Sequence, residues 1–280
     1  MNTHSITTIA AKAGLVLGLL AAGLAVQPAF AADGMAPLSG AGLPLVQEPF
    51  PALPAMDTQP KVGTYEPKRA NFAQAQPSRE ARHVADWAVD SGDNGAMPFV
   101  IVDKADARVF VFDAGGQLRG ASSALLGLAR GDDSVPGIGQ RKLSSILPEE
   151  RTTPAGRFVA ALDHNLQGKE MLWVDYETAI SLHPVVTSNA RERRAERLVT
   201  PSPLDNRISY GCINVPADFY ASVVSPAFTG TDGIVYVLPE TRSAHAVFGA
   251  YDVEERARLN MASQAVSAPV VSRSAANLTR

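Results

Sequence analysis

Hydrophobic residues between positions 97 and 240 fall into short runs of β-branched and aromatic side chains, a pattern that is typical of strands. The runs PFVIVD (98–103) and RVFVFD are joined by KADA, which predicts a β-hairpin. Further strands are predicted over 156–163, 171–175, 178–182 and 233–238. Many short strands at close spacing predict a mainly β, sandwich-like domain with a few short helices.

The pattern before this region is helical. Residues 78–90, SREARHVADWAVD, place Val84, Trp87 and Ala88 on one face of a helix. Ser78 is suited to cap the N-terminus of this helix, and the glycines that follow are suited to end it.

Three later segments interrupt or follow the strands. Residues 216–224, PADFYASVV, predict a short helix with Pro216 at its first position. The segment 187–207 predicts an Arg- and Glu-rich helix and a Pro-bounded loop, inserted among the strands. Beyond residue 240, HAVFGAYDVEERARLNMA predicts a further helix before a tail rich in Ala, Ser and Val.

The N-terminal pattern is that of a targeting segment. The apolar run LVLGLLAAGLAV (15–26) follows Lys12, is too short to span a bilayer and precedes Ala-Phe-Ala at 29–31. We therefore expect cleavage before Ala32, export to the periplasm or cell envelope, and no membrane span afterwards; a retained N-terminal anchor is the alternative. The expected organisation is a signal peptide (1–31), a disordered linker rich in Pro and Gly (32–77), a helix and turn (78–96), the β domain (97–240) and a partly disordered extension (241–280).

Net charge and the cysteine count exclude several kinds of partner and site. The net charge of −3 over 280 residues, with no long basic tract, argues against nucleic acid as a partner. The chain has one cysteine, Cys212, which excludes an internal disulfide and a multi-thiolate zinc site. An unpaired cysteine in an exported protein can be an inert buried side chain, half of an intermolecular disulfide, a metal ligand or a nucleophile.

A nucleophilic thiol needs a histidine close to it in space. His183 ends a predicted strand just before Pro184, where a rigid scaffold can present its ring to a groove. His245, on the C-terminal helix, is the alternative base. His83 and His164 have no supporting context, so we expect both at the surface or in loops.

The residues around Cys212 suit a nucleophile. Gly211 permits a tight turn and close approach of a substrate, and Ser209 could orient an imidazole. Backbone N–H groups of Gly211 and Cys212 could form an oxyanion hole, and the N-terminus of the helix at 216–224 could favour a thiolate.

The stretch SYGCIN resembles the S/T-H-G-C-x-(R/N) signature of the L,D-transpeptidase (YkuD-like) catalytic domain. Three upstream segments resemble the same family in the same order. They are FVIVDKADARVFVFDAGGQL, similar to its opening hairpin; TTPAGRF (152–158), similar to its T-P-x-G-x-F turn; and ISLHP, similar to the strand that bears its upstream histidine. The resemblance covers about residues 97–240.

The resemblance implies that Cys212 is the nucleophile and His183 its general base. It implies a site completed by Ser209, Tyr210, Gly211, Asn214 and Arg207. The expected substrates are peptidoglycan stem peptides: the thiol attacks a diaminopimelate carbonyl, D-Ala leaves, and the acyl group passes to an amine of another stem or of an envelope protein. No metal and no organic cofactor is implied, and carbapenems are expected to acylate the cysteine.

Two features depart from the family pattern. Tyr210 stands where the signature has a histidine, and the segment 187–207 lengthens the separation between His183 and Cys212. Two alternatives therefore stay open beside the transpeptidase. One is an envelope hydrolase or amidase that uses the same thiol with water as acceptor; the other is a catalytically silent peptidoglycan-binding module.

The inserted segment concentrates positive charge. Its guanidinium groups belong to Arg191, Arg193, Arg194, Arg197 and Arg207. They could form a lid that grips stem-peptide carboxylates, or a solvated helix face with Glu192 and Glu196 interleaved. Trp87 and Trp173 are expected to be packing residues rather than platforms for sugars.

Overall fold

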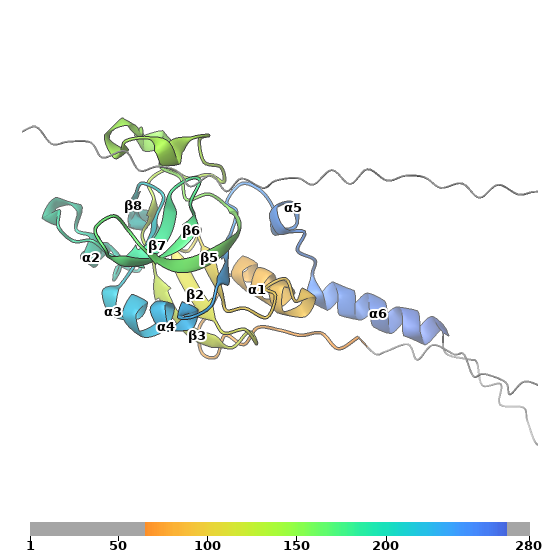
Figure 1. Ribbon diagram of the computed structural model, residues 1–280. Coiled ribbons are helices and arrows are strands. Elements are labelled where there is room, and N and C mark those ends of the chain that lie inside the picture. Colours follow the sequence, from red (N-terminus) through yellow and green to blue (C-terminus); the bar gives the residue numbers. More distant parts are fainter. Residues whose placement is uncertain (1–64, 268–280) are drawn as a thin grey trace, which may run out of the picture. The chain divides into compact units, whose positions relative to one another are not determined.

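The computed structural model describes residues 65–267 (Figure 1). The signal peptide predicted over 1–31 lies outside these residues, as does the predicted linker up to residue 64.

The strands are β1 (Phe99–Asp103), β2 (Arg108–Phe112), β3 (Leu118–Ser123), β4 (Leu126–Gly127), β5 (Gly156–His164), β6 (Glu170–Asp175), β7 (Ile180–Pro184), β8 (Arg207–Ser209), β9 (Ile213–Val215) and β10 (Gly233–Val237). The α-helices are α1 (Arg79–Ser91), α2 (Arg194–Arg197), α3 (Ala217–Phe219), α4 (Ser225–Phe228), α5 (Ala244–Phe248) and α6 (Val253–Ser267). Short 3-10 turns are η1 (Ile138–Gln140), η2 (Leu143–Ser145), η3 (Pro148–Glu150), η4 (Ala190–Glu192) and η5 (Pro203–Asn206), and η6 (Tyr220–Val224) is a π-helical turn. No helix within this described range is long and apolar enough to cross a membrane.

One mixed sheet contains eight of the strands, in the order β3-β2-β1-β10-β5-β6-β7-β9. The predicted hairpin forms its β1–β2 pair, which is antiparallel from Phe99↔Phe112 to Asp103↔Arg108. The two ends of the sheet approach each other, because Leu125 after β3 exchanges two backbone hydrogen bonds of 2.8 and 2.9 Å with Asn214 of β9. The sheet is therefore nearly closed, and the prediction of a mainly β domain is confirmed.

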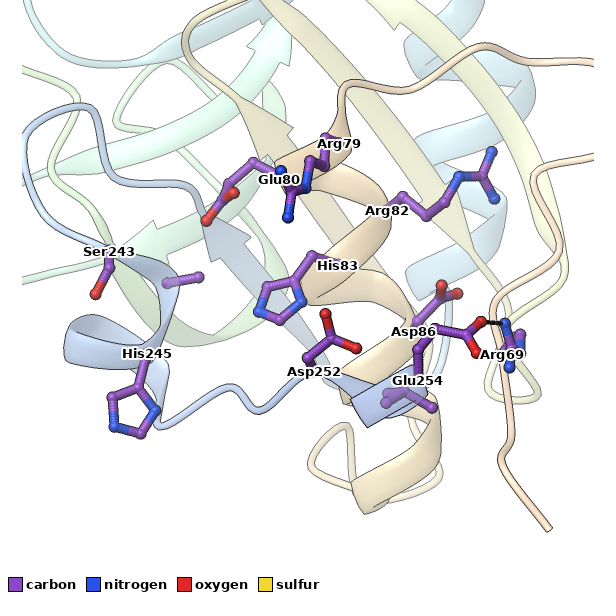
Figure 2. Close-up of a pocket in the computed structure, with 12 residues that line it drawn as sticks. Arg69, Arg79, Glu80, Arg82, His83, Asp86, Ser243, His245, Asp252 and Glu254 are labelled. Carbon is purple, nitrogen blue, oxygen red and sulfur yellow. Dashed lines mark hydrogen bonds and ion pairs between the residues drawn. The ribbon is translucent and has the colours of Figure 1, made fainter. Parts of the chain in front are cut away.

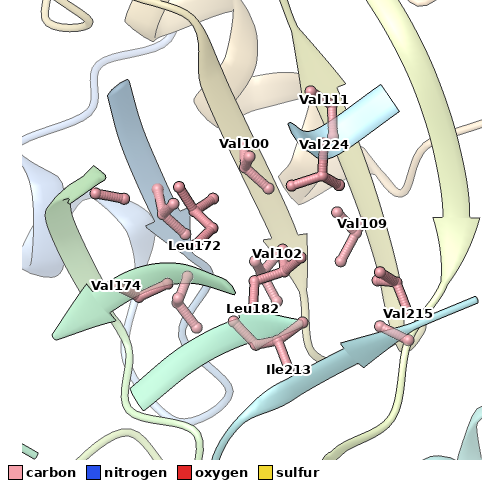
Figure 3. Close-up of a cluster of buried hydrophobic side chains, with 14 of the residues drawn as sticks. Val100, Val102, Val109, Val111, Leu172, Val174, Leu182, Ile213, Val215 and Val224 are labelled. Atoms are coloured by element: carbon pink, nitrogen blue, oxygen red, sulfur yellow. The ribbon is translucent and has the colours of Figure 1, made fainter. Parts of the chain in front are cut away.

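The first hydrophobic cluster fills the inside of this curled sheet (Figure 3). Successive side chains of a strand point to opposite faces, so alternate residues of each strand reach the interior. Val102 of β1 lies there beside Leu182 of β7 and Ile213 of β9, and all three are fully buried. Their neighbours along each strand point to the outside of the sheet.

The outer face of β1, β2 and β10 is covered by α1, which has the predicted bounds within one residue. Ser78 caps this helix by accepting a hydrogen bond from the Ala81 N–H, and Gly92 ends it with a left-handed φ of 72°. Val84, Trp87 and Ala88 are buried as predicted. The Trp87 ring meets Tyr236 of β10 edge to face, with the centroids 6.1 Å apart.

Residues on both sides of the β domain also pack into the hydrophobic cluster between α1 and the outer face of the sheet. The described part of the predicted linker, 65–77, packs on the sheet: Phe72 is 3% exposed and its ring lies 5.4 Å from that of Phe110. In the C-terminal extension, Tyr251 donates a hydrogen bond of 2.6 Å to Asp90 of α1. The described parts of both flanking segments are therefore integral to the fold.

Several elements differ from the sequence-based expectation. The helix predicted over 216–224 begins at Ala217, with Pro216 as its N-terminal cap, and continues through η6 to Phe228. The helix expected within 187–207 is reduced to η4, the four-residue α2 and η5. Each piece lacks the length and apolar face that would stabilise a longer helix, and side-chain hydrogen bonds from Arg194 to Asn214 and from Asn206 to the Ala124 carbonyl hold the segment on the domain instead.

A buried ion pair joins three loops at one end of the sheet. Lys104 is fully buried, and its amino group donates to Asp132 (3.1 Å) and to the carbonyl oxygen of Thr153 (3.0 Å). Asp132 also accepts from the backbone N–H groups of Glu240 (2.6 Å) and Thr241 (2.9 Å). The carboxylate is thus fully compensated, which is the condition under which a buried charge is tolerated.

We predict that Lys104→Met destabilises the protein, because it leaves Asp132 and the carbonyl oxygens of Gly131 and Thr153 without their cationic donor. The expected loss in the free energy of unfolding is about 3 kcal/mol. Urea denaturation followed by circular dichroism measures it. Lys142→Met, at an exposed position, is the matched control and should leave the midpoint unchanged. Equal midpoints for the two variants would contradict the prediction.

Candidate active site

The candidate site lies on the outer face of β7 and β9, which are parallel neighbours. The register pairs Leu182 with Ile213 on the core side and His183 with Asn214 on the outer side. Cys212 immediately precedes β9, so the strand pairing brings it to the end of β7 where Ser181 and His183 project. Residues far apart in the sequence are thus fixed next to one another by backbone hydrogen bonds.

The thiol of Cys212 is half-buried and has three polar neighbours. It donates to the carbonyl oxygen of Ala179 (3.6 Å) and accepts from the hydroxyl of Ser181 (3.6 Å), and the ring of His183 is the third polar group that acts on it. Burial raises the pKa of the thiol, but the His183 ring and the Ser181 hydroxyl together outweigh burial, so the net pKa of Cys212 is lowered. Polar partners that lower the pKa of a thiol are typical of the environments in which reactive cysteines occur.

The ring of His183 is held through both nitrogens. Nδ1 lies 2.8 Å from the carbonyl oxygen of Pro184, and Nε2 lies 3.1 Å from Nδ2 of Asn214. A carbonyl oxygen can only accept, so Nδ1 carries a proton and Nε2 is the nitrogen with the free electron pair in the neutral ring. Burial lowers the pKa of His183, but Cys212 and the Pro184 carbonyl raise it above its ordinary value, against the opposing charge of Arg194.

The turn before Cys212 is fixed by hydroxyl groups. Ser209 donates to the carbonyl oxygen of Cys212 (2.6 Å) and accepts from the N–H of Gly211 (3.1 Å). Its hydroxyl therefore holds its own turn, in place of the expected contact with the imidazole. Thr153 donates to the carbonyl oxygen of Gly211 (2.7 Å), which ties the TTPAG turn to the nucleophile turn.

Tyr210, which replaces the signature histidine, packs against a cation. The guanidinium of Arg151 lies 3.9 Å from the centre of the Tyr210 ring. Arg151 is also held by the carbonyl oxygen of Ile146, at 3.1 Å from Nη2. The turn beside Cys212 thus has a positive charge next to it.

Arg207 lies away from the catalytic pair. Its side chain is buried and contacts Glu240 (2.6 Å) and the carbonyl oxygen of Lys104 (2.7 Å), so it belongs to the ion-pair network at the end of the sheet. The N-terminus of the helix at 216–224 was expected to favour a thiolate at Cys212. Strand β9 separates Cys212 from α3, so the two are not adjacent in the chain. His245 lies on α5, with its ring 3.3 Å from the carbonyl oxygen of Ala250.

Three residues of the site were not singled out from the sequence as site residues. Ser181 contacts Cys212, Thr153 supports the turn, and Arg194 donates to Asn214 (2.7 Å). Ser181 could have been found from strand alternation, since it lies two residues before His183 and shares its face. The other two depend on contacts between distant segments.

A separate cavity of about 460 Å³ lies between α1 and the α5–α6 region (Figure 2). Its lining mixes Arg, Asp, Glu and His side chains, among them His83 and His245. Two of these charged residues, Arg69 and Glu254, form an ion pair. Cys212 and His183 do not line it. Within residues 65–267, no group of three or more His, Cys, Asp or Glu side chains is arranged to hold a metal ion.

Comparisons with known proteins give matches among solved structures. No family model matches the chain, and no curated protein matches it. One similar structure is an L,D-transpeptidase in complex with imipenem, at 15% identity and a TM-score of 0.28, where the match covers 50% of this chain and 58% of that one. Another is a cysteine-to-serine mutant of Enterococcus faecium L,D-transpeptidase, at 16% identity and a TM-score of 0.27, with 51% and 50% covered. The catalytic domain of the E. faecium enzyme matches at 16% identity and a TM-score of 0.26, with 50% of this chain and 96% of that domain covered.

These matches are to the family that the sequence motifs resemble. At this identity and these TM-scores no residue role passes from them to this chain.

We predict that Cys212 reacts with iodoacetamide at lower pH than an ordinary thiol, because His183 stabilises the thiolate. The pH dependence of the alkylation rate measures this. In His183→Ala the midpoint moves to higher pH, since the positive charge is lost, and Ser181→Ala gives a smaller move in the same direction. A wild-type profile like that of a free thiol, unchanged in His183→Ala, would refute the pairing.

Gly211 is required by the backbone of the nucleophile turn. Its φ is 130°, and a Cβ at this position would meet Cδ1 of Ile180 at 2.6 Å and the carbonyl oxygen of Thr152 at 2.8 Å. We predict that Gly211→Ala lowers the free energy of unfolding by about 2 kcal/mol and slows alkylation of Cys212. Gly168→Ala serves as control: φ there is also positive, at 72°, and no atom lies within 4 Å, so it tests an alanine at a positive φ without the clash, and we expect no slower alkylation.

Proposed function

We propose that this protein is a cysteine-dependent L,D-transpeptidase that acts on peptidoglycan stem peptides. The observation that carries the proposal is the pairing of Cys212 with His183, in which a thiol of lowered pKa meets a ring oriented by the Pro184 carbonyl. Such a pair performs acyl transfer through a thioester. The ordered motifs between residues 97 and 240, which resemble those of L,D-transpeptidases, support this substrate class.

The first half-reaction forms the acyl-enzyme. Nε2 of His183 takes the proton of Cys212, and Sγ attacks the diaminopimelate carbonyl to form a C–S bond. The C–N bond to D-Ala then breaks, and the imidazolium gives its proton to the leaving amine. The second half-reaction reverses the roles: an amine of another stem peptide attacks the thioester, His183 takes its proton, and the C–S bond breaks to return the thiol.

The negative charge on the carbonyl oxygen needs an N–H donor. The Gly211 N–H already donates to Ser209, so we assign this role to the backbone N–H of Cys212. Ser209 then acts by shaping the turn that presents this N–H. Asn214 holds the second nitrogen of the His183 ring.

We place recognition of the substrate at the Arg151–Tyr210 pair. Stem peptides carry carboxylates, and with Nε and Nη2 of Arg151 donating to the Ile146 carbonyl, we assign contact with such a group to Nη1. Tyr210 thus serves as a support for a cation rather than as a second imidazole. This function belongs outside the cytoplasm, where peptidoglycan is cross-linked, in agreement with the predicted signal peptide.

The test is acylation by imipenem, measured as the intact mass of the protein without its predicted signal peptide. We predict one adduct on the wild type, none on Cys212→Ala and at least about tenfold slower formation on His183→Ala. A disaccharide tetrapeptide then serves as substrate, and free D-Ala and the peptide products are quantified.

The outcomes separate the candidate functions. D-Ala release with cross-linked peptide supports the transpeptidase. D-Ala release with tripeptide alone means that water is the acceptor and the protein is a hydrolase. Peptidoglycan binding that is unchanged in Cys212→Ala, together with no imipenem adduct on the wild type, would overturn the proposal in favour of a binding module.

A further inference from the structure

Asn214 is a fully buried side chain whose polar atoms are all engaged. Its Nδ2 faces Nε2 of His183 (3.1 Å) and the carbonyl oxygen of Cys212 (3.4 Å). Its Oδ1 accepts from Nη1 of Arg194 (2.7 Å). The amide thus connects the inserted segment with the catalytic ring.

The chemistry of Arg194 decides which way this amide points. A guanidinium has only donors, so the atom of Asn214 that faces it must be the oxygen. A reversed amide would set its NH2 against the guanidinium and its oxygen against the Cys212 carbonyl, and both contacts are repulsive. The oxygen is therefore held on the side of Arg194, and the NH2 is held on the side of His183.

The orientation of the amide in turn decides the state of the ring. An NH2 group directed at Nε2 favours the ring form in which Nε2 is unprotonated, and Pro184 favours a proton on Nδ1. Both ends of the ring thus select one tautomer. In this tautomer the electron pair on Nε2 accepts from Asn214, and Nε2 takes up a second proton only when Cys212 becomes a thiolate.

Arg194 is itself fixed in place. Its Nε pairs with Glu192 of the same segment, and its side chain is only 14% exposed. Two other arginines of the segment have partners within it: Arg193 pairs with Glu196, and Arg197 donates to the carbonyl oxygens of Glu192 and Asp205. Arg194 is the one whose guanidinium contacts Asn214.

We propose that Arg194 is a positioning residue of the catalytic pair: it fixes the amide of Asn214 and thereby keeps His183 in the tautomer that accepts the thiol proton. This inference rests on the proposed function for its catalytic consequence but not for its structural content. It gives the insertion a role inside the site rather than over it. The charge of Arg194 acts in the same sense, since it disfavours a proton on His183 while Cys212 favours one. Glu192 moderates that charge through its ion pair with Arg194.

The first measurement reads the ring directly. In Cys212→Ala, where no thiolate holds a second proton on the ring, the 15N shifts of His183 above its pKa report the tautomer. His183→Ala identifies the resonances among those of the other histidines. We expect a single tautomer with Nε2 unprotonated, mixing of the two tautomers in Arg194→Met, and restoration by Arg194→Lys, which keeps a charge and a donor. Arg191→Met removes a guanidinium from the same segment and should change nothing.

The second measurement reads catalysis, with Cys212 present. We expect the rate of acylation by imipenem at neutral pH to fall about tenfold in Arg194→Met and to recover in Arg194→Lys. Glu192→Gln, which loosens Arg194 without removing it, should give a smaller fall. The Glu192 side chain is partly exposed, so we expect Glu192→Gln to fold. It therefore tests the role of Arg194 even if Arg194→Met does not fold.

Wild-type ring shifts in a folded Arg194→Met would overturn the inference, as would wild-type shifts and rates in Glu192→Gln if Arg194→Met fails to fold. Failure of the proposed function is a different result: the wild type is then not acylated, while the ring shifts still test the link from Arg194 to His183. Acylation of the wild type with Arg194 variants unaffected would leave the function standing and remove only this inference.

Discussion

The parallel pairing of β7 with β9 is the constraint on which the site depends. It sets His183 opposite Asn214 on the outer face while Leu182 and Ile213 enter the core opposite each other. A shift of one residue in this register would turn His183 and Asn214 inward and the apolar residues outward, so burial of Leu182 and Ile213 specifies where His183 lies relative to Cys212. The hydrophobic core therefore determines not only the stability of the sheet but also the position of the thiol.

The nucleophile turn adds a second set of constraints, all of them from polar backbone groups. Gly211 adopts a φ that side chains rarely tolerate, with Ile180 and Thr152 packed against its Cα. Thr153 and Ser209 satisfy the carbonyl oxygens of Gly211 and Cys212, which would otherwise be costly to bury. The TTPAG and SYGC motifs, which are separate in the sequence, are thus two halves of one structure, and each is needed to hold the other.

Charged side chains with little exposure hold loops and the inserted segment in place in this protein. Lys104 and Asp132 join loops at one end of the sheet, and Arg194 joins the inserted segment to Asn214. In each case the charged group has enough donors or acceptors to offset the loss of water, and in each case it fixes segments that have little apolar surface of their own. The segment 187–207 has few hydrophobic residues, of which Leu198 is buried, and hydrogen bonds from Arg194 and Asn206 supply polar contacts with the domain.

The sequence by itself determined the mainly β class, the helix α1 with its Ser78 cap, the opening hairpin and the choice of Cys212 and His183 as the residues to consider. These follow from local rules, namely the period of the hydrophobic pattern, the chemistry of caps and turns, and short motifs. Only the tertiary structure decided that Ser209 holds the turn rather than the ring, that Arg207 belongs to a distant ion-pair network, and that Arg194 reaches Asn214. A side-chain hydroxyl or guanidinium can bond to any partner within reach, and the partner within reach is set by how distant strands are paired, which no local pattern records.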